Sequence, residues 1–304
     1  MKNLLGAFVF ICVTPSAIAD QDQFKALDLR FEGSAYYGND SAVGITEIDQ
    51  LSLESDSEIR WTINPTAQWA FDNKTALLAG YNRTLSQYQT LDDYDTDIAD
   101  LNLGLKREWS WADTSYRFDH VTASVAGDDF LTLKMHTVDA GKLFNDRVYT
   151  RAALVTKQKR FEVLSERNAS ASGLNAQCFI FSKDYINTVI IAASLEQENA
   201  TTDYYSKDVM QLSLAWGHKT QLFTYNTKIK FSGRYSISDY QAFNPNLEAV
   251  REDTLFDLVL ESKVSITANV FASAEALYSD QQSNDASADY SRSILRIGVG
   301  VILD

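Results

Sequence analysis

Strict alternation of apolar and polar side chains is the feature that most constrains this fold. In residues 293–303, SILRIGVGVIL, the apolar Leu295, Ile297, Val299, Val301 and Leu303 alternate with Arg296, Gly298 and Gly300. Residues 27–35 and 223–237 repeat the pattern, and no segment shows a helical period. A period of two residues is that of a β-strand with one apolar and one polar face. The sequence therefore predicts an all-β protein.

The first 19 residues have the layout of a secretory signal peptide. Lys2 precedes an apolar run over residues 4–13, and the small residues Ala17 and Ala19 come before Asp20. The run is too short for a bilayer core of about 30 Å, which needs roughly 20 residues. We expect cleavage after Ala19, so that residues 1–19 are the signal peptide and residues 20–304 form one domain. Cys178 then remains as a single cysteine, and no intramolecular disulfide is expected.

The charge narrows the classes of partner. A formal net charge of -14 makes nucleic acid an unsuitable ligand for this exported chain. No apolar run reaches the length of a transmembrane helix, which leaves a soluble exported protein or an outer-membrane barrel. A soluble sandwich or adhesin would also alternate along its strands. The connections between strands separate these alternatives.

Short and long connections between the predicted strands alternate along the chain. Short turns are predicted near residues 72–74, 112–113, 145–146, 183–184, 219–220 and 265–267, and the first five carry polar or turn-prone residues. Longer acidic or polar stretches lie near residues 38–51, 91–97, 126–129, 161–168, 197–206, 239–253 and 280–289. This alternation of short turns and long loops is typical of a transmembrane antiparallel up-and-down β-barrel with periplasmic turns and extracellular loops. We predict about 14 strands, between about 12 and 16, with both termini periplasmic.

Aromatic residues cluster at the predicted strand ends, as in the interfacial girdles of membrane barrels. Those near the short turns are Trp69, Phe71, Trp109, Trp111, Phe144, Phe179, Phe181 and Trp216. Those beside the long loops are Tyr36, Tyr88, Phe130, Tyr204, Tyr235 and Tyr290. The alternative is the general preference of strands for aromatic residues.

The last strand is expected to pair with the first, because an open edge in hydrocarbon would leave backbone groups unsatisfied. Its Arg296, Gly298, Val301 and Leu303 resemble the C-terminal signal read by the outer-membrane barrel assembly machinery. Such strands usually end on an aromatic residue, whereas this one ends on Leu303 and Asp304. We expect that machinery, outer-membrane lipid and lipopolysaccharide to be partners of the chain.

Longer segments suggest a family. Residues 29–44, LRFEGSAYYGNDSAVG, and the ending DYSRSILRIGVGVIL, residues 289–303, are similar to the barrel domain of the surface lipoprotein assembly modifier family. The resemblance covers residues 26–304 and implies a cell outer-membrane location. It also implies a role in translocating or displaying an exported client protein at the cell surface. Longer members carry a helical repeat domain before the barrel, which we expect this chain to lack.

Alternation assigns ten charged side chains to the barrel lumen, where they would contact water. They are Arg30, Glu32, Arg60, Arg117, Lys228, Lys230, Arg234, Glu261, Glu275 and Arg296. Lys228, Lys230 and Arg234 form a basic row on one strand that would select anions or guide an acidic polymer. The alternative is that the lumen charges only pair across strands. A passive porin-type channel for small solutes with a partly basic lumen therefore stands beside the client-display function.

The sequence gives little indication of catalysis or metal binding. Asp119 and His120 are adjacent on a strand and therefore point to opposite faces, and no nucleophile accompanies them. The acidic segments LDDYDTD and GDDF do not follow the EF-hand order. We expect no enzymatic activity, no metal site and no cofactor.

Overall fold

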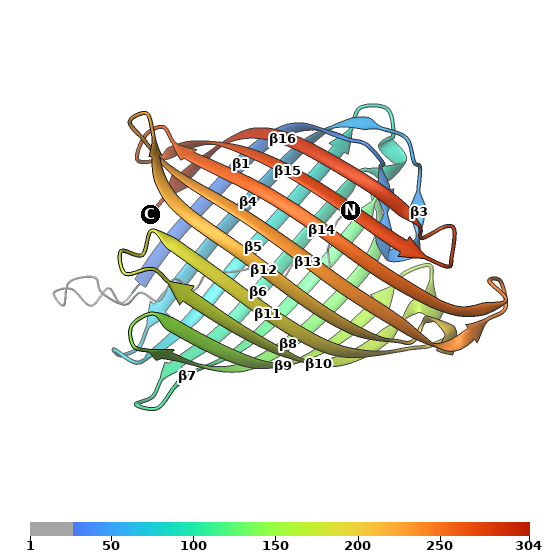
Figure 1. Ribbon diagram of the computed structural model, residues 1–304, viewed down its shortest axis with the longest axis horizontal. Helices are drawn as coiled ribbons and strands as arrows, with labels where there is room; N and C mark the ends of the chain where they lie inside the picture. Colours follow the sequence, from blue (N-terminus) through green and yellow to red (C-terminus); the bar gives the residue numbers. More distant parts are fainter. Residues whose placement is uncertain (1–26) are drawn as a thin grey trace.

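The protein is a closed antiparallel barrel of 14 strands (Figure 1). The structure, a computed structural model, describes residues 27–304, and the predicted signal peptide lies outside them. The strands are β1 (Leu27–Asp40), β4 (Asp56–Ala70), β5 (Thr75–Tyr88), β6 (Thr96–Glu108), β7 (Asp113–Val125), β8 (Asp128–Phe144), β9 (Val148–Phe161), β10 (Ala169–Phe181), β11 (Asn187–Ala200), β12 (Lys207–Leu222), β13 (Tyr225–Asn244), β14 (Ala249–Ser265), β15 (Val270–Ser283) and β16 (Tyr290–Leu303). Both the fold class and the strand number agree with the prediction.

The closing pair is β1 with β16. Its register runs from Phe31 opposite Leu303 to Asp40 opposite Ile294. Leu27 and Leu303 therefore lie at one rim, together with the short connections, and we call this rim the turn end. The other rim, the loop end, carries the longer connections and their short 3-10 helices η1 (Thr46–Ile48), η2 (Asp92–Tyr94), η3 (Ser165–Arg167) and η4 (Asp203–Tyr205). In outer-membrane barrels the short turns are periplasmic.

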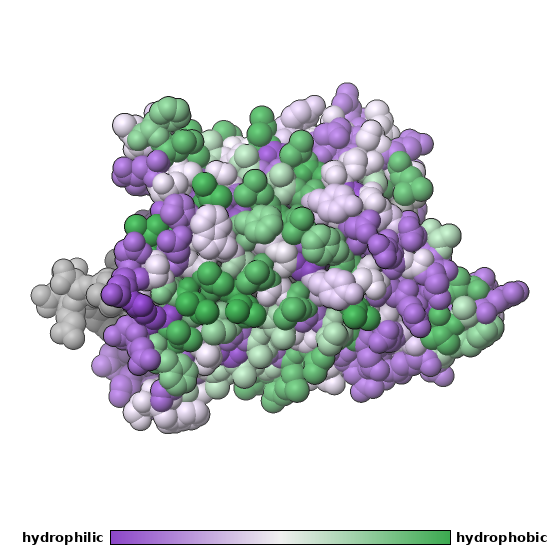
Figure 2. Space-filling model, in the orientation of Figure 1, coloured by the Kyte–Doolittle hydropathy of each residue, from purple (hydrophilic) through white to green (hydrophobic). Residues whose placement is uncertain are grey.

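The outer face carries an apolar band. Leu154, Leu174, Leu195 and Leu212 belong to adjacent strands and are all exposed on this face. Figure 2 shows apolar side chains across the middle of the face formed by β12 to β16, between more polar ends. Such an exposed belt requires lipid as its surroundings.

Among residues 27–304, no helix is long and apolar enough to cross a membrane.

The aromatic prediction is partly wrong. At the turn end Trp69, Phe71, Trp109, Trp111 and Phe144 are exposed as expected, but Phe179 lies against Tyr149, 5.9 Å between ring centroids, on the inner wall. At the loop end Tyr36, Tyr88 and Tyr290 lie on the inner face of their strands, where the Tyr88 hydroxyl donates to Asp40 Oδ2 over 3.1 Å. Proximity to a loop does not fix the face of a residue, whereas strand parity does.

Several connections differ from their predicted positions. The predicted loop at residues 126–129 is a tight turn over Ala126 and Gly127, with φ of 52° and 86°, where glycine is favoured. The turn predicted at residues 219–220 lies at Phe223 and Thr224, because β12 continues to Leu222. Strands β13 and β14 likewise extend into residues 239–253 and leave only residues 245–248 between them. Polar residues therefore continue the strands beyond the apolar band at both ends of the barrel.

The inward glycines of β16 leave room for aromatic rings. A Cβ added to Gly298 would lie 2.5 Å from Tyr36 Cδ1, and one added to Gly300 would meet the Phe271 ring. Tyr36 belongs to β1 and Phe271 to β15, the two neighbours of β16. These rings cover exposed backbone at the closing strand, a known way of stabilising glycine in sheets.

Candidate functional site: the barrel lumen

The loop between β1 and β4 crosses the mouth of the barrel at the loop end. It contains β2 (Gly44–Ile45), η1 and β3 (Gln50–Leu51). Its Ile48 packs against an apolar cluster of Ala123, Leu131 and Phe161, which comes from β7, β8 and β9 on a distant part of the wall. We call residues 41–55 the crossing loop. It narrows the lumen from above.

A carboxylate clamp holds the crossing loop. Arg251 of β14 donates from Nη1 and Nη2 to the two oxygens of Asp49, both over 2.8 Å. Arg167 of η3 donates to Asp49 Oδ2 over 3.0 Å and to the Glu47 carbonyl over 2.9 Å. A bidentate arginine gives such a contact both strength and a fixed orientation. The loop is therefore tied to β14 on one side and to the β9–β10 connection on the other.

The clamp depends on the charge of Asp49. Burial alone would raise the pKa of this carboxyl, but hydrogen bonds and charges from Arg251 and Arg167 hold that pKa below its usual range. A lowered folded-state pKa means that the clamp contributes fully above the ordinary aspartate pKa of about 3.9. Its contribution is lost as the pH falls through the lowered pKa. At neutral pH the loop is therefore held in place.

The structure places all ten predicted lumen residues on the inner face, and nearly all of them form ion pairs. The pairs are Arg30–Glu32 at 3.3 Å, Glu32–Lys263 at 2.7 Å, Arg60–Glu58 at 2.8 Å, Arg117–Asp119 at 3.0 Å, Lys230–Glu261 at 2.6 Å, Arg234–Asp257, Arg296–Glu58 at 2.6 Å and Arg296–Glu275 at 2.6 Å. Lys228 differs from the rest, because no ion pair within residues 27–304 engages it.

The basic row runs across the strands instead of along one strand. Lys230 and Arg234 on β13 each pair with a carboxylate of β14, so their charges are compensated. Lys219 of β12 and Lys263 of β14 lie directly opposite Lys228 in the register. Three lysines therefore lie side by side on the inner wall near the turn end. Within residues 27–304 a single ion pair engages them, between Lys263 and Glu32. This lysine row gives the β12–β14 part of that entrance a positive character.

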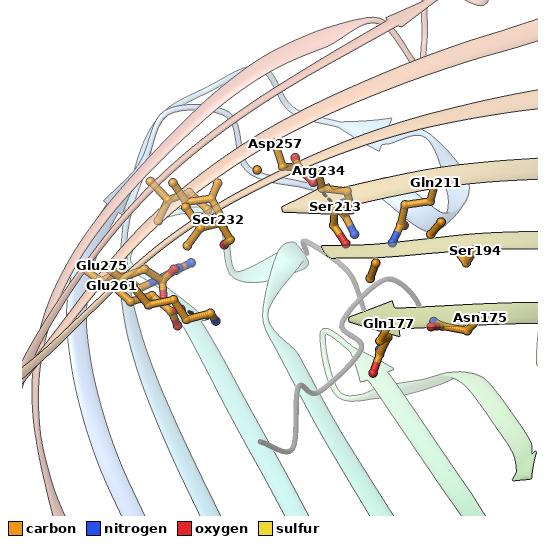
Figure 3. A pocket seen from close by; sticks show the side chains of 18 of the residues that line it. Asn175, Gln177, Ser194, Gln211, Ser213, Ser232, Arg234, Asp257, Glu261 and Glu275 are labelled. Atoms are coloured by element: carbon orange, nitrogen blue, oxygen red, sulfur yellow. Dashed lines mark hydrogen bonds and ion pairs between the residues drawn. The ribbon is translucent and has the colours of Figure 1, made fainter. Parts of the chain in front are cut away.

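At mid-height the lumen has two chemically different walls (Figure 3). Strands β10, β11 and β12 contribute uncharged amides and hydroxyls, namely Asn175, Gln177, Ser194, Gln211 and Ser213. The remaining lining strands, β4 and β13–β16, contribute the charges of Arg60, Lys230, Arg234, Glu261, Glu275 and Arg296. The side chains enclose a cavity of about 270 Å³ at this level, and another of about 240 Å³ lies beneath the crossing loop. Polar groups on every side suit a hydrated polar solute.

Sequence reasoning missed several members of the lumen network. Glu58 joins Arg60 to Arg296, and the Arg292 Nε donates to Asp40 Oδ1 over 2.7 Å. The sequence did contain a signal for Glu58 and Arg292. Glu58 lies two residues from Arg60, and Arg292 lies four residues from Arg296, so alternation places each on the same strand face as a predicted lumen residue. Asp49 had no such signal, since it belongs to a loop without strand parity.

The histidine and acidic segments form no recognisable catalytic arrangement. Asp119 is buried on the inner face, whereas His120 lies on the outer face opposite Lys134. His136 is also on the outer face, where its Nδ1 is 2.8 Å from the Tyr116 hydroxyl. Within residues 27–304 no three His, Cys, Asp or Glu side chains are grouped so as to hold a metal ion.

Known structures share this fold, whereas no protein-family model and no curated protein matches the chain. The in-vitro folded outer membrane protein OmpT of Vibrio cholerae, in its trimer form, aligns with a TM-score of 0.54 at 9% identity, covering 92% of this chain and 100% of that chain. The anion-selective porin from Comamonas acidovorans aligns with a TM-score of 0.54 at 5% identity, covering 91% and 99%. At such identities the likeness shows the fold of outer-membrane barrels and carries no function.

Proposed function

We propose that the protein is a narrow outer-membrane channel for small polar solutes, with a preference for anions. The lysine row carries this proposal, because Lys219, Lys228 and Lys263 place positive charge at the turn-end entrance of a polar lumen. Fixed charges lining a water-filled pore attract counter-ions and repel like charges. The anion-selective porin from Comamonas acidovorans is a structural precedent for such a role on this fold.

The lumen geometry supports small solutes over polymers. The crossing loop is clamped across the loop end by Asp49, and ion pairs fix the side chains below it. Paired charges hold their positions and keep a hydrated passage lined by groups of both signs. A folded client protein would require these contacts to break.

Reversing one lysine of the row is expected to change the ion preference. Lys228→Glu should shift the permeability ratio toward cations by about threefold or more, because it replaces the central, uncompensated cation of the lysine row with an anion. The measurement is the reversal potential of the purified protein in a planar bilayer under a salt gradient. Lys74→Glu, the same charge change at an exposed turn, is the control. Equal shifts in both variants would contradict a selective role for the lysine row.

A surface-assembly role, which the sequence resemblance implies, is a second candidate, and the β1–β16 seam favours it. This pairing spans ten residues, from Phe31 to Asp40, and includes Gly33, Gly38, Gly298 and Gly300. Short, glycine-containing pairings are weaker than long ones. The seam is the place where a barrel of this kind would open for a client. We also propose Arg296, Gly298, Val301 and Leu303 as the segment that the barrel assembly machinery reads.

Cross-linking the seam tests this second candidate. Ala35 and Val299 face each other across it, so cysteines at both positions can be joined by a short thiol cross-linker in a Cys178→Ser background. If the seam opens for a client, the cross-link should abolish display of that client on the cell surface. The matched control joins Leu174 and Leu195, an opposed pair within the wall. Undiminished display with a locked seam would exclude lateral opening.

A further inference from the structure

Three basic side chains project from neighbouring positions on the outer wall of β7, β8 and β9. His120 lies directly opposite Lys134, and Arg160 lies opposite Thr132, two residues from Lys134 on its strand. Opposed residues on a sheet have Cβ atoms about 5 Å apart and diagonal ones about 7 Å, within reach of long side chains. Tyr116, Val138 and Leu154 lie on the same faces of these strands and are exposed. We call His120, Lys134 and Arg160 the outer cationic cluster.

The long cations of this cluster are available for a ligand. Lys134 and Arg160 are exposed, and no carboxylate within residues 27–304 forms an ion pair with either. Another outward arginine, Arg83, is neutralised by Asp97 at 2.6 Å. Asp129 and Glu162, the next acids toward the loop tips, also form no ion pair with the cluster. Two uncompensated cations side by side repel each other, and an anion between them relieves that repulsion.

The height of the cluster matches a lipid headgroup region. Lys134 precedes Phe144, the turn-end limit of β8, by about ten residues. At about 3.3 Å per residue and a strand tilt of about 40°, Lys134 lies about 25 Å above the turn end. The apolar band of such barrels is also about 25 Å tall. Below the cluster on the same strands lie the apolar Val138 and Leu154, so acyl chains fit beneath it.

The opposite part of the outer wall has the opposite charge. Near the loop end of β12, β13, β14 and β15 the outward residues include Asp208, Asp239, Glu252 and Asp280. Asp208 faces Asp239, which faces Glu252. An anionic lipid is therefore attracted to the β7–β9 side and repelled from the β12–β15 side.

We propose that the outer cationic cluster binds a phosphate group of lipopolysaccharide in the outer leaflet. The guanidinium of Arg160 and the ammonium of Lys134 donate charge-assisted hydrogen bonds to the phosphate oxygens. His120 adds a ring donor, and the outward Gln158, opposite Lys134, adds an amide. The lipid acyl chains then lie on the apolar surface below. This site is separate from the lumen and does not depend on the proposed channel.

Binding of purified lipopolysaccharide to the folded protein in non-ionic detergent tests the proposal. The variant is Lys134→Gln with Arg160→Gln, and the control is Arg107→Gln with Lys142→Gln, two outward cations beside Trp109 and Phe144 at the turn end. Both double variants remove the same charge. Native mass spectrometry gives the affinities, and a heat-dependent shift in gel mobility checks that each barrel is closed.

The cluster variant is expected to bind lipopolysaccharide about tenfold more weakly than the wild type, and the turn-end control should bind like the wild type. Enzymatically dephosphorylated lipopolysaccharide should bind the wild type as weakly as intact lipopolysaccharide binds the cluster variant. Equal affinities of the two double variants would overturn the proposal. Two results with the wild type alone would also overturn the proposal, even if the cluster variant failed to fold. One is equal affinity for phosphorylated and dephosphorylated lipopolysaccharide. The other is equal affinity for phosphatidylglycerol and lipopolysaccharide.

Discussion

Replacing Arg292 by methionine is expected to lower the free energy of unfolding by about 3–5 kcal/mol, because it leaves a buried carboxylate without its counter-ion. The Arg292 and Asp40 side chains are 1% and 0% exposed, and they join the last strand to the end of β1. Within residues 27–304, Asp40 would keep the Tyr88 hydroxyl at 3.1 Å and the Ala42 amide at 3.2 Å. Equilibrium unfolding in urea with lipid vesicles, followed by tryptophan fluorescence, measures the change.

Two further variants show whether the buried charge is the cause. Removing both partners, as in Arg292→Met with Asp40→Leu, should recover most of the lost stability, since no uncompensated charge then remains. Lys106→Gln breaks the more exposed pair with Glu108 and should cost less than about 1 kcal/mol. A similar loss of unfolding free energy in all three variants would mean that the buried Arg292–Asp40 pair contributes no more to stability than the exposed pair.

Removing the crossing loop is expected to enlarge the pore. If residues 43–52 are replaced by a short Gly-Ser linker, single-channel conductance should rise by about twofold or more, since the narrowest section limits ion flow. The physical reason is the position of the loop, which reaches β7, β8 and β9 through Ile48 and β14 through Asp49. Single-channel recording in a planar bilayer gives the value directly.

A point substitution in the crossing loop and a control deletion elsewhere extend the conductance measurement. Asp49→Asn removes the charge that Arg251 and Arg167 hold, so it should produce brief transitions to the higher conductance at neutral pH. Shortening the β13–β14 connection at residues 245–248, whose hydrogen bonds stay within its own hairpin, should leave conductance unchanged. An unaltered conductance after loss of the crossing loop would show that the constriction lies elsewhere.

The fold was predictable because the alternation of side chains along each strand determines which residues face lipid and which face the lumen. Once the apolar Leu295, Ile297 and Val299 are assigned to lipid, Arg296 and its neighbours must face the lumen, and the structure places them there. Strand ends were harder to predict, because the strands continue past the apolar band into polar sequence, as β12 does to Leu222 and β13 to Asn244. Polar alternation beyond either edge of the apolar band looks like loop sequence, although the backbone remains paired.

The site was less predictable than the fold, and the reasons differ between residues. Parity places Lys228, Lys230 and Arg234 on one face, but it cannot show that Glu261 and Asp257 on the next strand neutralise two of them. That result requires the register between strands, which also creates the row of Lys219, Lys228 and Lys263. The Asp49 clamp depends on contacts between segments about 120 and 200 residues apart in the chain, and such loop contacts leave no periodic trace.

In the proposed channel, the lumen conducts ions while the seam stays closed. The most direct measurement is single-channel conductance of the refolded protein with Ala35→Cys and Val299→Cys joined across the seam. We expect a steady current with a preference for anions, equal to that of the uncross-linked protein, because ions pass the lysine row inside a closed wall. A correctly folded barrel that carries no current, with or without the cross-link, would contradict the channel function.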